Sequence, residues 1–321
     1  MIARELIPLP AYAEEVAQGL ITYPKSLPCK LFYDSRGSAL FEEITRLPEY
    51  YPTRTELEIL RDRADEMALA IGPGVTVVEL GAGTAAKTCT LLQGLARRQM
   101  RVRYFPVDIS PAALSEARER VQQQCPQVSV RPVVVDFSNG FGFLRDIPGR
   151  KLVAYLGSSI GNFDPCSAVD MLTQIKDELT PDDALLLGTD LVKPKSILVP
   201  AYDDSQGVTA QFNKNILYRL NRELGANFDP DLFRHIAQWN SQQSRMEIYL
   251  ESTQDQAADI SVLNLQVQFA EGERIHTENS YKYTMRMVQS LLKKSGYELS
   301  QTWFDKQKWF GLHLANVQQS M

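Results

Sequence analysis

Residues 75–84 read VTVVELGAGT, an apolar and β-branched run that leads into Glu79 and then into two closely spaced glycines. Residues 87–95 follow with the pattern of a helix. A buried parallel strand that turns at glycines into a helix is typical of the ligand-binding corner of a doubly wound α/β sheet. This stretch therefore predicts an α/β fold with a binding site beside the two glycines.

The next two predicted strands also end in polar residues. Residues 101–108 end in Asp108, and residues 128–135 lead into Asp136 and Phe137. Because the carboxyl ends of parallel strands lie along one edge of a sheet, we expect these side chains near the glycine turn. The Asp108 carboxylate can accept hydrogen bonds from both hydroxyls of a ribose. Asp136 can accept a hydrogen bond from the amino group of adenine, and Phe137 can stack on the adenine ring. Acids that merely cap helices are the alternative.

The glycine turn departs from the pattern of dinucleotide-binding proteins. Its spacing is E-L-G-x-G-T, and Ala86 stands where the third glycine of G-x-G-x-x-G would be, which disfavours a dehydrogenase. The E-x-G-x-G form resembles motif I of class I S-adenosylmethionine (SAM) methyltransferases. That resemblance implies a SAM site made by Gly81, Gly83, Thr84, Lys87, Asp108, Asp136 and Phe137. Lys87 also fits a plain surface charge of a helix.

Composition limits the classes of partner and the number of domains. With 321 residues the chain exceeds the usual size of one hydrophobic core, so two domains are expected. The net charge of −5 offers no electrostatic attraction for nucleic acid or an anionic membrane. No apolar run approaches the ~20 residues that span a bilayer, and the N-terminus does not read as a signal peptide. A monomeric, cytoplasmic enzyme that acts on a small molecule is expected.

Cysteines and histidines are scattered along the chain without metal-binding spacing. The residues are Cys29, Cys89, Cys125, Cys166, His235, His276 and His313. Scattered cysteines suggest reduced thiols, and no zinc or other metal site is predicted.

The chain alternates strands and helices only in part of its length. Residues 55–191 do so, and residues 283–321 add a hairpin that we expect to complete the sheet in antiparallel fashion. Residues 1–54 and 192–282 are left over and predict a second domain over the carboxyl edge of the sheet. The expected fold class is thus α/β: a Rossmann-like class I methyltransferase sheet that binds SAM, with a discontinuous α+β substrate-binding domain.

Helix and strand signals locate several individual elements. Thr53 with Glu56 three residues later reads as a capping box at the start of a helix. In the second domain, residues 209–224 predict a helix, and residues 245–252 and 261–269 predict strands.

Several longer sequence segments of the chain resemble those of one methyltransferase family. They are KSLP at 25–28, FYDSRGS at 32–38, RLPEYYPTRTE at 46–56, LGSSIGN at 156–162, LGTDLVK at 187–193, AYDD at 201–204 and VTAQFN at 208–213. They are similar to the histidine-specific Nα-methyltransferases of ergothioneine biosynthesis, over essentially the whole chain. The resemblance implies three methyl transfers from SAM to the α-amino group of L-histidine, which give hercynine.

The resemblance also implies the roles of individual residues. Tyr50, Asn162 and Tyr202 match the residues that hold the substrate carboxylate and place its amine. Glu278 and Ser280 match the pair that reads the imidazole. On an extended segment these two residues share a face, so an acceptor and a hydroxyl can bond both ring nitrogens. Each residue also has a plainer reading, such as a turn for Asn162 or a solvated strand face for Glu278.

Three further residues are expected around the substrate. Phe41 and Tyr33 line the pocket, and Tyr33 acting through a water is the candidate for assisting proton loss from the amine. Ile248 is expected in the pocket wall, where a member of the family has a methionine of similar volume, so the exchange bears on selectivity for histidine. Two alternatives stay open: N-methylation of another aromatic amino acid such as tryptophan, and a SAM-binding protein without catalytic activity.

Overall fold

The computed structural model describes residues 10, 12–137 and 140–318, and the chain divides into two compact units. Unit 1 comprises Met1–Tyr51 and Pro194–Ser280, and unit 2 comprises Pro52–Lys193 and Tyr281–Met321. The domain boundaries expected after residues 54, 191 and 282 lie two or three residues from these divisions.

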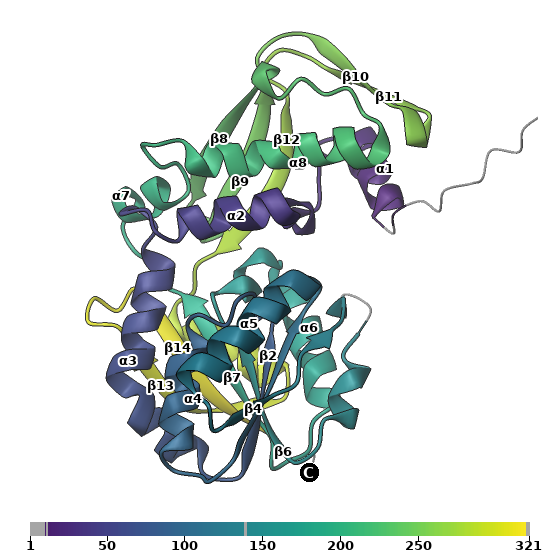
Figure 1. The fold of residues 1–321 in the computed structure, drawn as a ribbon. Coiled ribbons are helices and arrows are strands. Elements are labelled where there is room, and N and C mark those ends of the chain that lie inside the picture. Colours follow the sequence, from purple (N-terminus) through teal and green to yellow (C-terminus); the bar gives the residue numbers. More distant parts are fainter. Residues whose placement is uncertain (1–9, 11, 138–139, 319–321) are drawn as a thin grey trace, which may run out of the picture. The chain divides into compact units, whose positions relative to one another are not determined.

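Unit 2 is built on an eight-stranded sheet of order β13-β14-β7-β6-β2-β3-β4, in which β5 also pairs with β3 (Figure 1). The strands are β2 (Val75–Leu80), β3 (Val102–Asp108), β4 (Val128–Val130), β5 (Val133–Val134), β6 (Arg150–Tyr155), β7 (Ala184–Asp190), β13 (Tyr297–Phe304) and β14 (Phe310–Val317). The pairs among β2 to β7 are parallel, whereas β14 runs antiparallel to β7 and to β13. This topology confirms the expected class I methyltransferase sheet with its antiparallel final strand.

Helices cover both faces of this sheet. Val77 and Val78 are adjacent in β2 and belong to different core clusters, as the alternation of side chains along a strand requires. The Val77 face packs against α3 (Tyr51–Ile71), α4 (Thr88–Ala96) and α5 (Pro111–Gln124). The Val78 face packs against α6 (Pro165–Asp177), α9 (Met285–Lys294) and the 3₁₀ helix η3 (Gly142–Asp146).

The predicted third strand, residues 128–135, is divided into β4 and β5. The break falls at Arg131 and Pro132. Proline has no backbone N–H, so it cannot donate to a neighbouring strand. The pairing with β3 resumes at Val133, which aligns with Val107, and Asp108 at the end of β3 aligns with Val134.

The predicted capping box at Thr53 and Glu56 is wrong. Helix α3 already begins at Tyr51, with Pro52 in its first turn, where proline is favoured because its missing N–H would have no partner inside the helix. Glu56 is fully buried and accepts a hydrogen bond from the N–H of Gly157 at 2.7 Å. The carboxylate therefore serves a tertiary contact and not the helix terminus.

Unit 1 contains a four-stranded sheet of order β1-β12-β9-β8 and a separate two-stranded sheet. The elements are α1 (Ala13–Ile21), β1 (Lys25–Ser26), η1 (Cys29–Phe32), α2 (Ser35–Ile44), α7 (Lys195–Leu198), η5 (Val199–Ala201), α8 (Val208–Leu224), η6 (Pro230–Leu232), β8 (Phe233–Asn240), β9 (Arg245–Ser252), β10 (Gln256–Ile260), η7 (Ser261–Leu263), β11 (Leu265–Phe269) and β12 (Arg274–Tyr281). Val16, Leu40, Leu217 and Leu250 belong to one core cluster, which joins α1, α2 and α8 to the sheet.

The strand predicted at residues 261–269 begins only at Leu265. Its first three residues form η7, and Asn264 adopts a left-handed backbone with φ 48°. Asparagine tolerates this conformation and ends the turn, so β11 is shorter than predicted.

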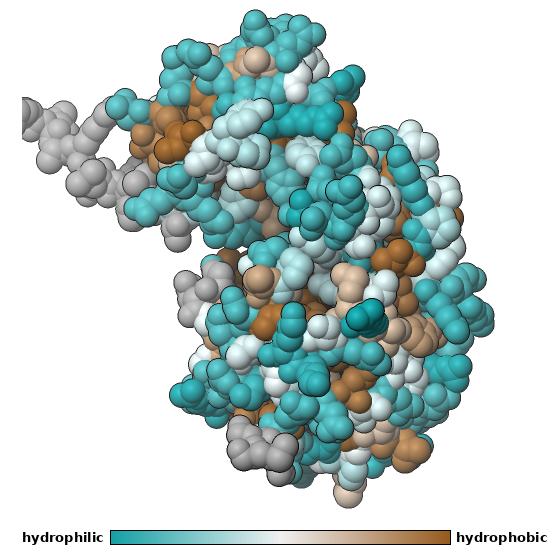
Figure 2. Space-filling view, turned by 180° about the vertical axis from the view of Figure 1, so that it is seen from behind, coloured by the Kyte–Doolittle hydropathy of each residue, from teal (hydrophilic) through white to brown (hydrophobic). Residues whose placement is uncertain are grey.

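Hydrophilic residues predominate on the face drawn in Figure 2, and hydrophobic residues form separate small groups there. Within the described part of the chain, none of the helices combines the length and the apolar character that crossing a membrane requires.

Candidate functional site

The glycine turn after β2 has the backbone that its sequence predicts. Gly81 has φ +66° and Gly83 has φ +50°, both in the left-handed region that glycine enters without steric cost. A Cβ atom built on either glycine would meet no other atom within 4 Å. The turn thus leaves open space beside its backbone, as a ligand that approaches closely would need.

Asp108 joins this turn to the end of β3. One carboxylate oxygen accepts a hydrogen bond from the N–H of Gly83 at 2.9 Å, and the other accepts from the N–H of Ser110 at 2.9 Å. Each carboxylate oxygen can accept more than one hydrogen bond, so ribose hydroxyls can still bind. The structure therefore brings Gly83 and Asp108 together at the carboxyl edge of the sheet.

Lys87 and Thr84 lie on the same turn but are already bonded within the protein. The ammonium of Lys87 pairs with the buried carboxylate of Glu56. The carbonyl of Thr84 accepts from Nε of Arg120 at 3.1 Å. Glu56, which sequence reasoning assigned to a helix cap, links α3 to Lys87 and to Gly157 after β6.

Asp136 and Phe137 follow β5, and Asn162 follows β6, which are two parallel strands of the same sheet. Asp136 is exposed just beyond β5, and Phe137 stacks on Phe141 with ring centroids 5.8 Å apart. Asn162 is the last residue of the 3₁₀ helix η4 (Ser159–Asn162), which follows β6. All three thus occupy the carboxyl edge at which Asp108 lies.

Glu79 is a buried acid whose importance the sequence did not reveal. It is 3% exposed at the end of β2, accepts from the hydroxyl of Thr88 at 2.6 Å and is bonded by the hydroxyl of Tyr104. Burial raises the pKa of Glu79 to about 7, which outweighs the opposing effect of these two hydrogen bonds.

This pKa predicts a pH-dependent stability. The folded state binds the Glu79 proton more tightly than the unfolded chain does. Protonated Glu79 therefore adds to the free energy of unfolding below pH 4.5, and this contribution is lost as the pH rises through about 7. Glu79→Gln removes the titration. Between about pH 4.5 and pH 7, the free energy of unfolding of the native protein should therefore fall by up to about 3 kcal/mol more than that of Glu79→Gln.

Urea denaturation at several pH values measures this difference. Glu66→Gln is the matched control, because Glu66 is an exposed residue of α3 in the same unit. Parallel pH profiles for the native protein and Glu79→Gln would contradict the prediction.

Aromatic residues of unit 1 form a connected cluster. The ring centroids of Tyr33 and Phe41 are 5.8 Å apart, those of Phe41 and Tyr50 are 6.1 Å apart, and those of Tyr50 and Tyr202 are 6.5 Å apart. Phe212 of α8, which sequence reasoning missed, packs against Tyr33 and Phe41. Tyr33, Tyr50 and Tyr202, which come from three separate family-like segments, are thus linked ring to ring through Phe41, in edge contacts that leave π faces for other groups.

Tyr202 also connects this cluster to β12. Its hydroxyl is 2.8 Å from Oγ of Ser280, which is 5% exposed. Glu278 lies two residues before Ser280 on the same strand, so both side chains project from the same face. Ile248 is buried on the neighbouring strand β9, and its carbonyl oxygen lies 3.2 Å from Oγ1 of Thr277.

Tyr33 is held in its neutral form. Burial of the hydroxyl raises the pKa of Tyr33 well above its ordinary value, and the negative charge of Glu278 adds to this effect. Because 43% of the residue's surface is exposed, the shift is smaller than full burial would give, but both causes act in the same direction. Tyr33 therefore cannot serve as a phenolate base at neutral pH and can act only through its neutral hydroxyl.

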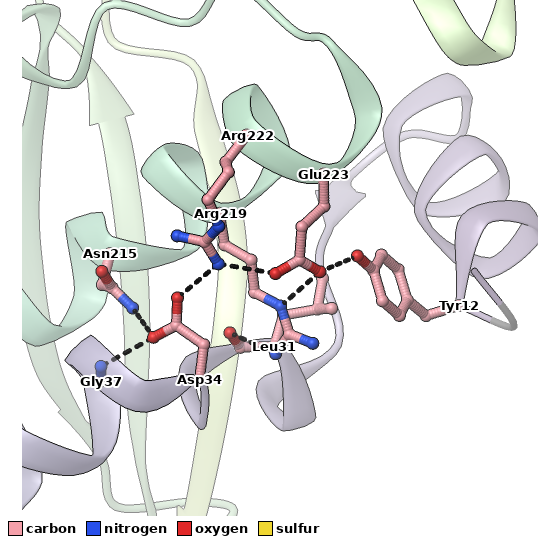
Figure 3. A network of polar contacts seen from close by, with 8 residues as sticks. All are labelled: Tyr12, Leu31, Asp34, Gly37, Asn215, Arg219, Arg222 and Glu223. Atoms are coloured by element: carbon pink, nitrogen blue, oxygen red, sulfur yellow. Dashed lines mark hydrogen bonds and ion pairs between the residues drawn. The ribbon is translucent and has the colours of Figure 1, made fainter. Parts of the chain in front are cut away.

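A polar network fastens the segment that carries Tyr33 and Phe41 to α8 (Figure 3). Asp34 caps α2 by accepting from the N–H of Gly37 at 2.7 Å. Its carboxylate also accepts from Asn215 at 2.8 Å and from Arg222 at 2.7 Å, both on α8. Arg219 adds a bond to the carbonyl of Leu31 at 3.1 Å. These contacts hold the backbone on both sides of Tyr33 in place.

A family model described as "Histidine-specific methyltransferase, SAM-dependent" matches residues 12–317. The chain belongs to this family. Histidine N-alpha-methyltransferase of Mycolicibacterium smegmatis is 45% identical over 305 residues, which are 95% of this chain and 94% of the relative. The protein of the same name from Mycobacterium tuberculosis is 45% identical over 307 residues, with the same coverage of both chains.

More distant relatives and solved structures are also similar to this chain. Ergothioneine biosynthesis protein 1 of Neurospora crassa is 31% identical over 300 residues, or 91% of this chain and 33% of the relative. The solved structure of the glycopeptide N-methyltransferase MtfA with sinefungin has a TM-score of 0.43 and 13% identity, and the match covers 81% of this chain and 87% of that one.

Family membership confirms the resemblance seen in the sequence. The chain is a SAM-dependent N-methyltransferase that acts on a small molecule. The residues present suit SAM: the open space beside Gly81 and Gly83 admits a ligand, and Asp108 offers acceptors for its ribose.

Proposed function

We propose that this methyltransferase trimethylates the α-amino group of L-histidine and so makes hercynine in the first step of ergothioneine biosynthesis. The observation that carries the proposal is the contact between the hydroxyl groups of Tyr202 and Ser280. Ser280 and Glu278 project from the same face of β12. The contact links a residue proposed to hold the substrate carboxylate with the pair proposed to read its imidazole. The names of the two mycobacterial relatives support the same substrate.

Neutral and charged groups have different tasks in this proposal. The family resemblance assigns Tyr50, Asn162 and Tyr202 to the substrate carboxylate, where neutral groups add no charge near the sulfonium. Glu278 accepts from one imidazole nitrogen, and Ser280 bonds the other. Substrates that lack these nitrogens leave the two polar groups without partners, which is a strong basis for rejection.

The protein has to align the amine and allow it to lose protons. SAM, when bound, supplies a methyl group already activated by its sulfonium. Good alignment of two reactants can lower the barrier by about 7–11 kcal/mol. Only a neutral amine can attack the methyl group, so a proton has to leave an ammonium before each of the three transfers, and we propose that the neutral Tyr33 hydroxyl passes it to water. The edge-packed rings of Phe41 and Tyr50 can then accommodate the quaternary cation by cation–π contact.

For the SAM side we propose the backbone of Gly81, Gly83 and Thr84, with Asp108 on the ribose and Asp136 and Phe137 on the adenine. Lys87 is proposed to order the glycine turn through Glu56 as well as to lie beside the cofactor. Ile248 is proposed as an apolar pocket wall, which its burial permits.

An end-point assay by mass spectrometry tests the function. Purified protein is incubated with SAM and all proteinogenic amino acids in one vessel. A product with three added methyl groups on L-histidine alone supports the proposal. Methylated tryptophan or tyrosine would contradict the substrate, and SAM binding without any methylated amino acid would contradict catalysis.

We further propose that the enzyme works as a monomer in the cytoplasm, without nucleic acid or membrane partners. The net charge of −5 and the free thiols of Cys29, Cys89, Cys125 and Cys166 are consistent with this setting.

A further inference from the structure

A buried asparagine of α8 connects three strands of unit 1. Asn213 is 1% exposed, and its Nδ2 donates to the carbonyl of Tyr249 at 2.9 Å and lies 2.9 Å from Nδ1 of His235. Its Oδ1 accepts from the hydroxyl of Thr277 at 2.8 Å. The amide thus uses both of its donor hydrogens and its acceptor on β8, β9 and β12, an arrangement that only an amide can satisfy.

His235 extends this network to the segment that bears Tyr202. Its Nε2 lies 2.8 Å from the carbonyl oxygen of Tyr202. Because a carbonyl oxygen only accepts, Nε2 carries the hydrogen, and Nδ1 accepts from Asn213. Burial lowers the pKa of His235, which agrees with a neutral ring in this one tautomer.

The network ends on both sides of the proposed L-histidine site. At one end, the backbone of Tyr202 is held while its hydroxyl meets Ser280. At the other end, Thr277 directly precedes Glu278 on β12. A continuous chain of hydrogen bonds therefore leads from Ser280 on β12 through Tyr202, His235 and Asn213 to Thr277, which is also on β12.

We propose that Asn213 and His235 are positioning residues, which set the spacing between Tyr202 and the Glu278–Ser280 pair and thereby control the affinity for L-histidine. This inference rests on the proposed function. Neither residue has to touch the substrate. Fixing the recognition groups in advance removes the cost of ordering them when the substrate binds.

Two substitutions at His235 separate positioning from simple packing. The amide nitrogen of His235→Gln can reach the place of Nε2 and restore the donor to the Tyr202 carbonyl, whereas the shorter His235→Asn reaches only the place of Nδ1. We expect His235→Asn to raise the Kd for L-histidine by about 5- to 50-fold, because the partly buried Tyr202 carbonyl loses the donor that fixes it. His235→Gln should recover most of this loss, and the Kd for SAM should stay unchanged in both variants.

Titration calorimetry measures both dissociation constants, with S-adenosylhomocysteine present when L-histidine is titrated. His313→Asn is the matched control, because His313 is fully buried between Thr189 and Thr302 in unit 2. It should lower the melting temperature without a comparable change in the Kd for L-histidine. Asn213→Asp provides a second variant if His235→Asn does not fold, since aspartate keeps the acceptor for Thr277 and loses both donors.

Equal Kd values for L-histidine in the native protein, His235→Asn and Asn213→Asp would overturn the positioning role. Equal losses in His235→Asn and His235→Gln would also overturn it, because packing alone would then account for the effect. The native protein is titrated first. If it binds SAM but not L-histidine, the proposed function itself fails, and that result is distinct from the other two.

Discussion

Glu278→Gln is expected to lower kcat/KM for L-histidine by about 10- to 150-fold. A hydrogen bond to a charged group contributes about 1.5–3 kcal/mol, and each 1.36 kcal/mol corresponds to a tenfold change in rate. Glutamine has nearly the same shape as glutamate, so the strand and its neighbours should remain in place. What is lost is the negative charge that we propose to face the imidazole.

Initial rates at several L-histidine concentrations measure this effect, together with the Kd for SAM, which should not change. Glu271→Gln is the matched control, because Glu271 is exposed in the turn before β12 and should leave kcat/KM unaltered. A value of kcat/KM for Glu278→Gln within twofold of the native one would remove Glu278 from the imidazole site.

Asp190→Ala is expected to lower the free energy of unfolding by about 3–5 kcal/mol, the usual cost of leaving a buried charge without its partner. Asp190 is 1% exposed at the end of β7 and pairs with two lysines, Lys193 and the fully buried Lys282. Burial alone would raise the pKa of Asp190, but the charges of Lys282 and Lys193 outweigh it and hold that pKa below its ordinary value. Alanine would leave two ammonium groups close together in the core.

The two lysines already repel each other in the native protein. Burial lowers the pKa of Lys193 to about 8, and the charge of Lys282 contributes to this shift. The negative charge of Asp190 raises the pKa of Lys193, against burial and the charge of Lys282, so its removal lowers that pKa further. Asp190→Ala should therefore be destabilised least at high pH, where Lys193 can lose its proton.

Urea denaturation followed by circular dichroism measures the loss of stability. Asp65→Ala is the matched control, because Asp65 pairs with Arg97 at the surface, where ion pairs contribute less than about 1 kcal/mol. Similar unfolding free energies for Asp190→Ala and Asp65→Ala would show that the lysines find other partners.

Local patterns were enough to predict the sheet of unit 2. The run at β2 and the glycines after it, the start of α5 at Ser110 and Pro111, and the extent of β7 all depend on neighbours in the chain. Ser110 accepts from the N–H of Ala113, as an N-cap residue should. The resemblance to the family likewise indicated Tyr202 and Ser280 as site residues, and their side-chain oxygens lie 2.8 Å apart.

Distant contacts decided the rest. Glu56 is three residues after Thr53, which is the spacing of a cap, yet it bonds Gly157 across unit 2. The pKa values of Glu79 and Tyr33 depend on burial, which no local pattern reports.

The sequence by itself determined the class of sheet, the glycine turn and the family, because these follow from hydrophobic periodicity, backbone freedom and contiguous words. Only the tertiary structure decided which polar side chains share a partner. Asn213, His235 and Thr277 are far apart in the chain, and burial makes their mutual hydrogen bonds necessary once the fold has brought them together.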